Sequence, residues 1–144
     1  MSTGVGMRAV AVSRPALLCV AAVALAGCTS INATNVTLEG TRWQILSIDG
    51  QPTPRTEMYR MSFEARRAGG RFGCNHFSGQ YSAAGETLRI ADTTSTLMGC
   101  PEPAASFERE GFAVLQQPMR MSWSSERQLI LTSSAGSIAL ERLP

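Results

Sequence analysis

Short apolar segments separated by turn signals dominate the sequence after residue 40, and this pattern most restricts the possible folds. Tyr59, Met61 and Phe63 alternate with other residues, as in a strand with one buried face. Asp49-Gly50 and Ala84-Gly85 are turn signals. Similar segments predict strands over residues 41–48, 58–64, 71–81, 87–90, 94–98, 119–123, 128–132 and 137–143.

Two of the predicted strands change phase along their length. The apolar pattern of residues 41–48 shifts between Ile45 and Leu46, which indicates a bulge or a strand buried on both faces. Within residues 71–81, the alternation first puts Phe72, Cys74 and His76 on one face. It then changes phase, so that Phe77, Gly79 and Tyr81 line up instead. We interpret this segment as one strand that bends at Gly73 or Gly79.

One helix interrupts the strands, over residues 103–117. Phe107, Gly111, Val114 and Leu115 recur at helical spacing and predict a buried stripe. Residues 108–110 (Glu-Arg-Glu) are predicted to face solvent. A single helix against an antiparallel sheet gives an α+β fold, with a strongly curved sheet that we expect to form a partial barrel.

The first 28 residues resemble a secretory signal. Two arginines precede an apolar run of 10 or 11 residues, which is too short to span a bilayer as a helix. Leu25-Ala26-Gly27-Cys28 resembles a bacterial lipobox, so Cys28 is the predicted lipid attachment site and mature N-terminus. Secretion with ordinary cleavage is the alternative, and translation starts at Met1 or Met7.

The predicted mature chain has a flexible tether over residues 29–37 and one folded domain over residues 38–144. Thr29, in place of an aspartate after the lipidated cysteine, favours an outer-membrane location facing the periplasm in an organism with that membrane. From Cys28 onward, 11 arginines balance 11 acidic residues. This neutral, dispersed charge argues against nucleic-acid binding.

Only Cys74 and Cys100 remain in the predicted folded domain. A cysteine pair in an exported protein is read first as a disulfide. Closing that 27-residue loop would stabilise the fold by about 3 to 4 kcal/mol in the chain-entropy model.

His76 raises two alternatives to the disulfide. Cys74 and His76 are two residues apart and, with Cys100, could supply three metal ligands. A Cys-His nucleophilic pair would need a free thiol and a third, orienting group. A disulfide removes both thiolates, so we expect no metal and no cofactor, and we interpret His76 as a partly exposed strand residue of undetermined role.

The usual catalytic motifs are missing from the sequence, which contains no GxSxG, GxGxxG or Walker loop. The acidic residues that we considered have no recognisable acid/base spacing and are interpreted as surface residues; they are Glu57, Glu64, Glu86, Asp92 and Glu102. We therefore predict a protein that is not an enzyme.

Several blocks together resemble the META domain family, which includes the HslJ-like heat-shock-associated envelope lipoproteins. The blocks are residues 38–43 (LEGTRW), 73–75 (GCN), 78–81 (SGQY), 96–100 (TLMGC), the helix with Phe107 and Glu108, and residues 129–131 (LIL). The resemblance covers residues 38–143 and implies a small α+β domain in the bacterial envelope, associated with stress response. The family-motif residues are Gly73, Asn75, Gly79, Tyr81, Thr96 and Met98.

The resemblance also suggests that the two cysteine-bearing blocks are neighbours in space. Asn75 is a candidate hydrogen-bonding hub, Tyr81 a core aromatic with a paired hydroxyl, and Thr96 a strand residue. His76 stands where family members usually have an arginine, which argues against a fixed chemical role there.

Three functions remain open at this point. The first is a non-enzymatic lipoprotein that supports envelope stress tolerance by contacting an unidentified envelope protein or other component. The second is a module that binds a hydrophobic or antibiotic-like small molecule on the concave sheet face, with candidate wall residues Met58, Met61, Met119, Met121 and Trp123. The third is a thiol or metal enzyme using Cys74, His76 and Cys100.

Overall fold

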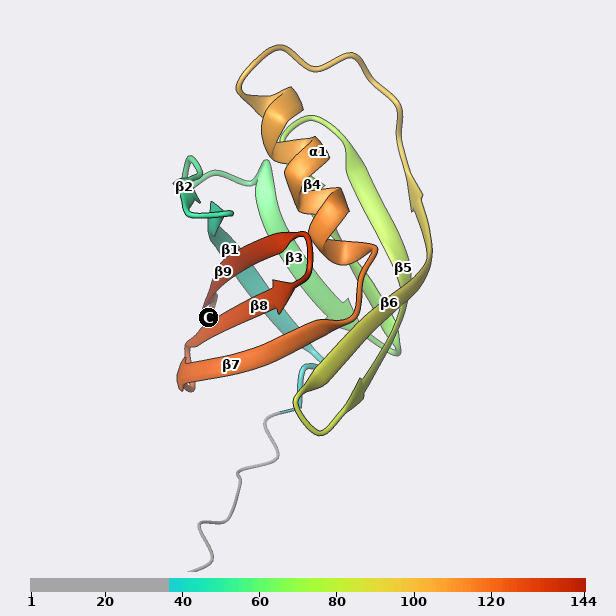
Figure 1. The fold of residues 1–144 in the computed structure, drawn as a ribbon, viewed down its shortest axis with the longest axis vertical. Helices are drawn as coiled ribbons and strands as arrows, with labels where there is room; N and C mark the ends of the chain where they lie inside the picture. Colours follow the sequence, from blue (N-terminus) through green and yellow to red (C-terminus); the bar gives the residue numbers. More distant parts are fainter. Residues whose placement is uncertain (1–36) are drawn as a thin grey trace, which may run out of the picture. The chain divides into compact units, whose positions relative to one another are not determined.

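The computed structural model describes residues 37–144 as a curved antiparallel sheet with one helix (Figure 1). The predicted signal, Cys28 and most of the tether lie outside the described residues. The elements are β1 (Thr41–Ile48), β2 (Gln51–Pro52), β3 (Tyr59–Glu64), β4 (Arg67–Phe72), β5 (His76–Ala84), β6 (Thr87–Ser95), α1 (Ala104–Leu115), β7 (Met119–Ser125), β8 (Gln128–Ser133) and β9 (Gly136–Arg142). No helix among these residues is long and apolar enough to cross a membrane.

The sheet closes into a barrel instead of remaining partly open. Neighbouring strands pair in the order β1-β3-β4-β5-β6-β7-β8-β9, and β9 pairs with β1, so that eight strands form a ring. The β1–β9 seam runs from Trp43 opposite Arg142 to Ile48 opposite Ile138. The α+β prediction is confirmed, and the partial barrel is corrected to a closed one. Pairing β1 with β9 removes the exposed edges that an open sheet would leave.

The predicted bulge in the first strand is confirmed. The register of β1 against β9 shifts between Ile45 and Ser47. The extra residue bends β1, as barrel closure requires. Asp49 and Gly50 both have positive φ and form the turn to β2 that their residue types predict.

The single strand predicted over residues 71–81 is wrong. The chain reverses at Gly73-Cys74-Asn75, and the segments on either side become β4 and β5, paired antiparallel with Arg71 opposite His76. The change of phase that we interpreted as a bend marks this reversal. Conversely, the strands predicted over residues 87–90 and 94–98 form one strand, β6, which ends at Ser95 and has a bulge opposite Ser78–Gln80.

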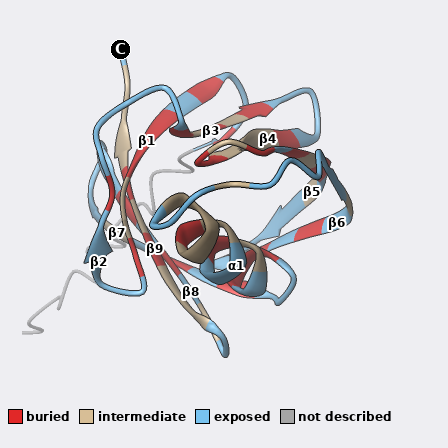
Figure 2. Cartoon of the chain, turned by 90° about the horizontal axis from the view of Figure 1, so that it is seen from above, coloured by how far each residue is buried: buried red, intermediate tan, exposed pale blue. Residues whose placement is uncertain are grey.

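The helix α1 fills one end of the barrel, and its predicted buried stripe is confirmed. Phe107, Gly111, Val114 and Leu115 are buried, and Figure 2 shows the helix inside the ring of strands. A Cβ on Gly111 would lie 2.7 Å from the ring of Phe72. Glycine at this position therefore lets the helix backbone approach β4.

Large apolar side chains fill the barrel interior. Those with essentially no exposed surface include Trp43, Phe63, Phe72, Leu115, Met119, Leu131 and Ile138. Phe72 and Phe77 stack on each other, and Phe112 of the helix meets both edge to face, with ring centroids 4.9 to 5.9 Å apart. The loops at the helix end of the barrel are therefore attached to strands and a helix that are held by a packed core.

Candidate functional site: a loop cluster held by a disulfide

Two loops meet at the helix end of the barrel. One is the turn at residues 73–75 between β4 and β5, and the other is the connection at residues 96–103 between β6 and α1. Both lie near the N-terminal end of α1, at the top of Figure 1. A disulfide joins Cys74 to Cys100 across the two loops, with their Cα atoms 6.0 Å apart.

The side chain of Asn75 connects the two loops from a buried position. The residue is only 1% exposed. Its Oδ1 accepts hydrogen bonds from Thr96 Oγ1 at 2.7 Å and from the backbone N–H of Met98 at 2.8 Å. Its Nδ2 donates to the backbone oxygen of Met98 at 2.9 Å. Asn75 therefore serves as a hydrogen-bonding hub. Its side-chain amide pairs with the backbone N–H and C=O of Met98, as a backbone amide of a neighbouring strand would.

Glu108 completes this hub from the helix, contrary to our expectation that it faces solvent. Asn75 Nδ2 lies 2.9 and 2.8 Å from the two carboxylate oxygens of Glu108, and Glu108 Oε2 is 3.2 Å from Cys100 Sγ. The sequence places Glu108 next to two charged residues, so a solvated face was the natural interpretation. The resemblance to the META family, which includes this glutamate, was the available signal for its role.

The disulfide decides what chemistry the cluster can perform. Cys74, Cys100 and Glu108 have ligand atoms within 4.8 Å of one another, which is close enough for a metal ion. The sulfurs are bonded to each other, however, so neither is available as a thiolate ligand or nucleophile. In this oxidised form the cluster is a structural brace.

His76 lies apart from this group. It begins β5 with an exposed side chain, and its backbone N–H donates to Thr96 Oγ1 at 3.0 Å. The triad of Cys74, His76 and Cys100 considered from the sequence is therefore wrong, because the group of possible ligands in the described chain contains Glu108 instead. The exposed position agrees with our interpretation of His76 as a strand residue.

Glycine is required at the start of the first loop. Gly73 has φ +110°, and a Cβ there would lie 3.0 Å from Ala104 at the start of α1. Its N–H donates to the backbone oxygen of Met58 at 2.7 Å. The reversal at this position brings the loop against the first turns of α1, where Asn75 contacts Glu108.

The remaining motif residues have packing roles. Gly79 lies at the β5–β6 bulge, where a Cβ would be 2.7 Å from the backbone oxygen of Ala91. Tyr81 packs edge to face on Phe63 with centroids 5.0 Å apart, and burial, followed by the charge of Glu39, raises its pKa above the usual value. The expected hydroxyl partner of Tyr81 is not found within residues 37–144, and Thr96 lies just after β6 instead of within a strand.

Two apolar side chains are exposed on the loop segment whose backbone is hydrogen-bonded to the side chain of Asn75. Leu97 is 91% exposed and Met98 is 53% exposed. We call these two residues the apolar tip. Leu97 of the tip lines a surface hollow of about 320 Å³ together with Glu108 and Phe112 of the helix. These two neighbouring side chains form an exposed apolar patch beside the loop that the disulfide braces.

The candidate ligand-binding wall on the concave sheet face is not present. Met61, Met119 and Met121 are buried in the core, and Trp123 packs against Trp43 with centroids 5.7 Å apart. Of the proposed wall residues only Met58 is exposed, at 38%. The concave face is occupied by the protein's own side chains, so these residues do not form an open cleft.

A carboxylate caps the start of the helix. Glu102 Oε2 accepts hydrogen bonds from Ser106 Oγ at 2.7 Å and from its backbone N–H at 3.1 Å. The side-chain hydrogen bond from Ser106 is the main reason that the pKa of Glu102 is below its usual value, and Arg109 contributes as well. This interaction ties the loop that follows Cys100 to the first turn of α1.

These features define a class of small closed β-barrel that one helix fills at one end and a disulfide braces. The family model of the META domain matches residues 36–142, and the chain belongs to the META domain family.

Two solved structures have a similar fold. A protein studied by NMR is 20% identical with a TM-score of 0.63, and the match covers 72% of this chain and 90% of that one. An NMR structure of a protein from Burkholderia xenovorans is 20% identical with a TM-score of 0.57, covering 74% of this chain and 83% of the other. Comparison with curated proteins finds none that matches.

Proposed function

We propose that this META domain protein is a non-enzymatic envelope lipoprotein, anchored through lipid on Cys28, that supports stress tolerance by contacting an envelope protein. The observation that carries the proposal is the disulfide between Cys74 and Cys100. Structural disulfides persist in oxidising compartments outside the cytosol. The signal-like residues before Cys28 independently support the same route of export.

The apolar tip of Leu97 and Met98 is the surface proposed for the contact. The disulfide and Asn75 fix the loop on both sides of the tip, so little conformational entropy remains to be lost when a partner binds. The hollow beside Phe112 can receive an apolar side chain from the partner. Glu108 and Arg109 on the rim of that hollow supply polar contacts.

The lipid anchor is tested on protein purified from membranes of the native host. Intact-protein mass spectrometry should show an N-terminus at Cys28 carrying a lipid, and a mass two hydrogens lower than that of the reduced chain. An unmodified Cys28, or an N-terminus elsewhere, would contradict the anchor.

The contact surface is tested by complementing a deletion strain under heat and hydrophobic antibiotics. Leu97→Ser with Met98→Ser should lose protection while the protein accumulates at its normal level. Ile130→Ser is the matched control, because Ile130 is also an exposed apolar residue, at 40%, on β8 away from the loop cluster. Full protection by the tip variant would remove the tip from the proposal.

A further inference from the structure

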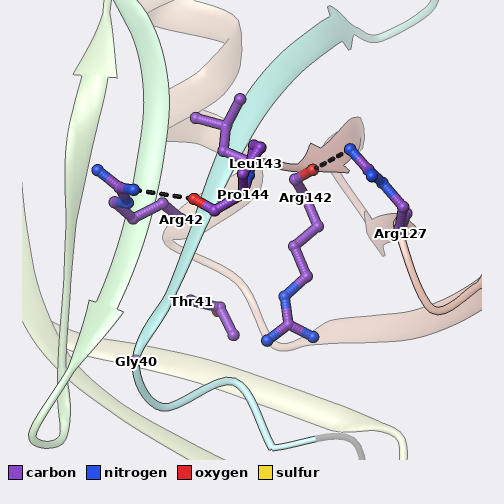
Figure 3. Close-up of a pocket in the computed structure, with 7 residues that line it drawn as sticks. All are labelled: Gly40, Thr41, Arg42, Arg127, Arg142, Leu143 and Pro144. Atoms are coloured by element: carbon purple, nitrogen blue, oxygen red, sulfur yellow. Dashed lines mark hydrogen bonds between the residues drawn. The ribbon is translucent and has the colours of Figure 1, made fainter.

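Three arginines line a hollow at the end of the barrel opposite α1. β1 runs from Thr41 at this end to Ile48 near the helix, and β9 runs in the other direction to Arg142. Arg42, Arg127 and Arg142 line the hollow with Gly40 and Thr41, and its volume is about 370 Å³ (Figure 3). We call this the arginine hollow.

Backbone hydrogen bonds hold the three arginines on adjacent chain segments. The N–H of Arg142 donates to the oxygen of Arg127 at 2.8 Å, and the N–H of Leu143 donates to the oxygen of Arg42 at 2.8 Å. The segment that follows β9 therefore lies between Arg42 and Arg127. The spacing of the arginines is fixed by the ends of the sheet and does not depend on a mobile loop.

Side-chain hydrogen bonds position two of the guanidinium groups at the rim. Arg42 Nη2 donates to the backbone oxygen of Pro144 at 2.9 Å, and Arg127 Nη2 donates to that of Arg142 at 3.2 Å (Figure 3). The side chain of Arg142 extends between them toward Thr41, and it has no hydrogen-bond partner in the described chain. Each guanidinium carries five donors, so N–H groups remain for a ligand.

The hollow has a local excess of positive charge. No aspartate or glutamate side chain lines it, although the predicted mature chain as a whole is neutral. The nearby Glu141 is bound to Arg55 at 2.7 Å, and Glu39 and Glu126 adjoin lining residues in the sequence without lining the hollow themselves. Within residues 37–144, the ion pairs involve other arginines. A phosphate oxygen is the kind of anion that a guanidinium fork binds in a bidentate manner.

The arginine hollow also lies where the chain leaves the predicted tether. Gly40 and Thr41 line it, and the described chain begins at Thr37. Thr37 lies nine positions after Cys28, and a fully extended segment of that length spans at most about 32 Å. A lipid on Cys28 would therefore keep this end of the barrel within reach of the headgroups.

We propose that the arginine hollow binds the phosphate of an anionic phospholipid in the membrane that carries the protein. This inference rests on the proposed lipid anchor and adds an orientation to it. The hollow faces the bilayer, and the apolar tip at the other end of the barrel faces away, where an envelope partner can reach it.

The test uses the chain from Thr29 onward, without the signal and Cys28, so that no anchor contributes to binding. This segment contains the complete described core, from Leu38 to Leu140, and the β1–β9 seam, and it therefore folds as a unit. Cosedimentation is measured with vesicles of phosphatidylglycerol and phosphatidylcholine in equal parts, and with phosphatidylcholine alone. We expect binding to the anionic vesicles only, weakening as salt is raised.

Arginine substitutions localise the binding. Arg42→Gln, Arg127→Gln and Arg142→Gln should each lower the partition coefficient about fivefold. Arg89→Gln is the matched control, because Arg89 is exposed on β6, outside the hollow and in no ion pair of the described residues, and it should leave the coefficient unchanged. Thermal melting of each variant distinguishes loss of the fold from loss of the site.

Three results would overturn the proposal: equal binding to neutral vesicles, unchanged binding by all three folded arginine variants, or binding of inorganic phosphate in the hollow without any vesicle binding. The last result would assign the site to free phosphate. The anchor is judged separately by mass spectrometry at Cys28, so either proposal can fail without the other.

Discussion

The two ends of the barrel are built in different ways. At the helix end, α1, the disulfide and the buried Asn75 tie together loops that are far apart in the sequence. At the other end, the arginine hollow is open to solvent, and two of its guanidinium groups are held by hydrogen bonds to backbone oxygens. We infer that substitutions at the helix end will lower the free energy of unfolding more than substitutions at the arginine end. The side chains at the arginine end can therefore serve binding at little cost to the fold.

The largest effect is expected from breaking the disulfide. Cys74→Ala with Cys100→Ala should lower the free energy of unfolding by about 3 to 4 kcal/mol, because the bond closes a loop of 26 positions in the unfolded chain. Urea unfolding measures the loss, and adding reductant to the unmodified protein should reproduce it. A melting temperature that does not respond to reductant, with two free thiols by mass, would contradict the bond.

Removal of the Asn75 side chain should have the next largest effect. Asn75→Ala leaves Glu108 and the backbone groups of Met98 without their partner, and it should cost about 2 to 3 kcal/mol in unfolding free energy. Asn75→Asp should destabilise the protein as well, because it replaces the donor with a carboxylate facing Glu108. Stability close to that of the unmodified protein for both variants would show that the hub is dispensable.

Adding a methyl group where α1 lies closest to β4 should lower the free energy of unfolding moderately. Gly111→Ala places a methyl group 2.7 Å from Phe72, and the strain should exceed the gain in helix propensity, for a net loss of about 1 kcal/mol. Gly99→Ala is the control, because a Cβ there meets nothing within 4 Å. Equal stability of the two variants would mean that the helix can shift without cost.

The helix cap should give a small effect that depends on pH. The folded protein lowers the pKa of Glu102, so its contribution is fully present above the pKa of an unfolded glutamate and is lost as the pH falls through the lower folded value. The difference in melting temperature between the unmodified protein and Glu102→Gln should therefore be present at neutral pH and vanish in acid. NMR titration of the Glu102 carboxyl carbon gives the pKa directly, and an ordinary or raised value would refute the cap.

Substitution at the arginine end should have the smallest effect on stability. Arg127→Gln or Arg142→Gln should change the unfolding free energy by no more than about 0.5 kcal/mol, because neither side chain is buried in the core. The same urea experiment provides the measurement. A loss as large as that of Asn75→Ala would show that the two ends do not differ as we describe.

Local patterns were sufficient to predict the helix, its buried stripe, the bulge in β1 and most strands. They were insufficient at the β3–β4 turn, where Ala65 and Arg66 both have positive φ although neither residue type favours it. The following segment, Ala68-Gly69-Gly70, carries few strand-forming side chains, so β4 was detected only at its end. Burial between neighbouring strands overrides the local preference there.

Contacts between distant segments explain the other differences. Barrel closure depends on β1 and β9, whose pairing leaves no signal in the apolar pattern of either strand. Glu108 is charged and flanked by charged residues, and only the fold shows that Asn75, 33 positions earlier, lies opposite it. The shared location of the two cysteine-bearing loops was predictable because the sulfurs provided a reason to join them.

The β1–β9 seam determines when the protein can fold as well as how. Arg42 and Pro144, in contact at that end, are 102 positions apart, and the ring cannot form until β9 is present to pair with β1. Contacts of such long range make folding slow. A chain threaded N-terminus first through a translocation channel could thus close its barrel only after β9 has emerged.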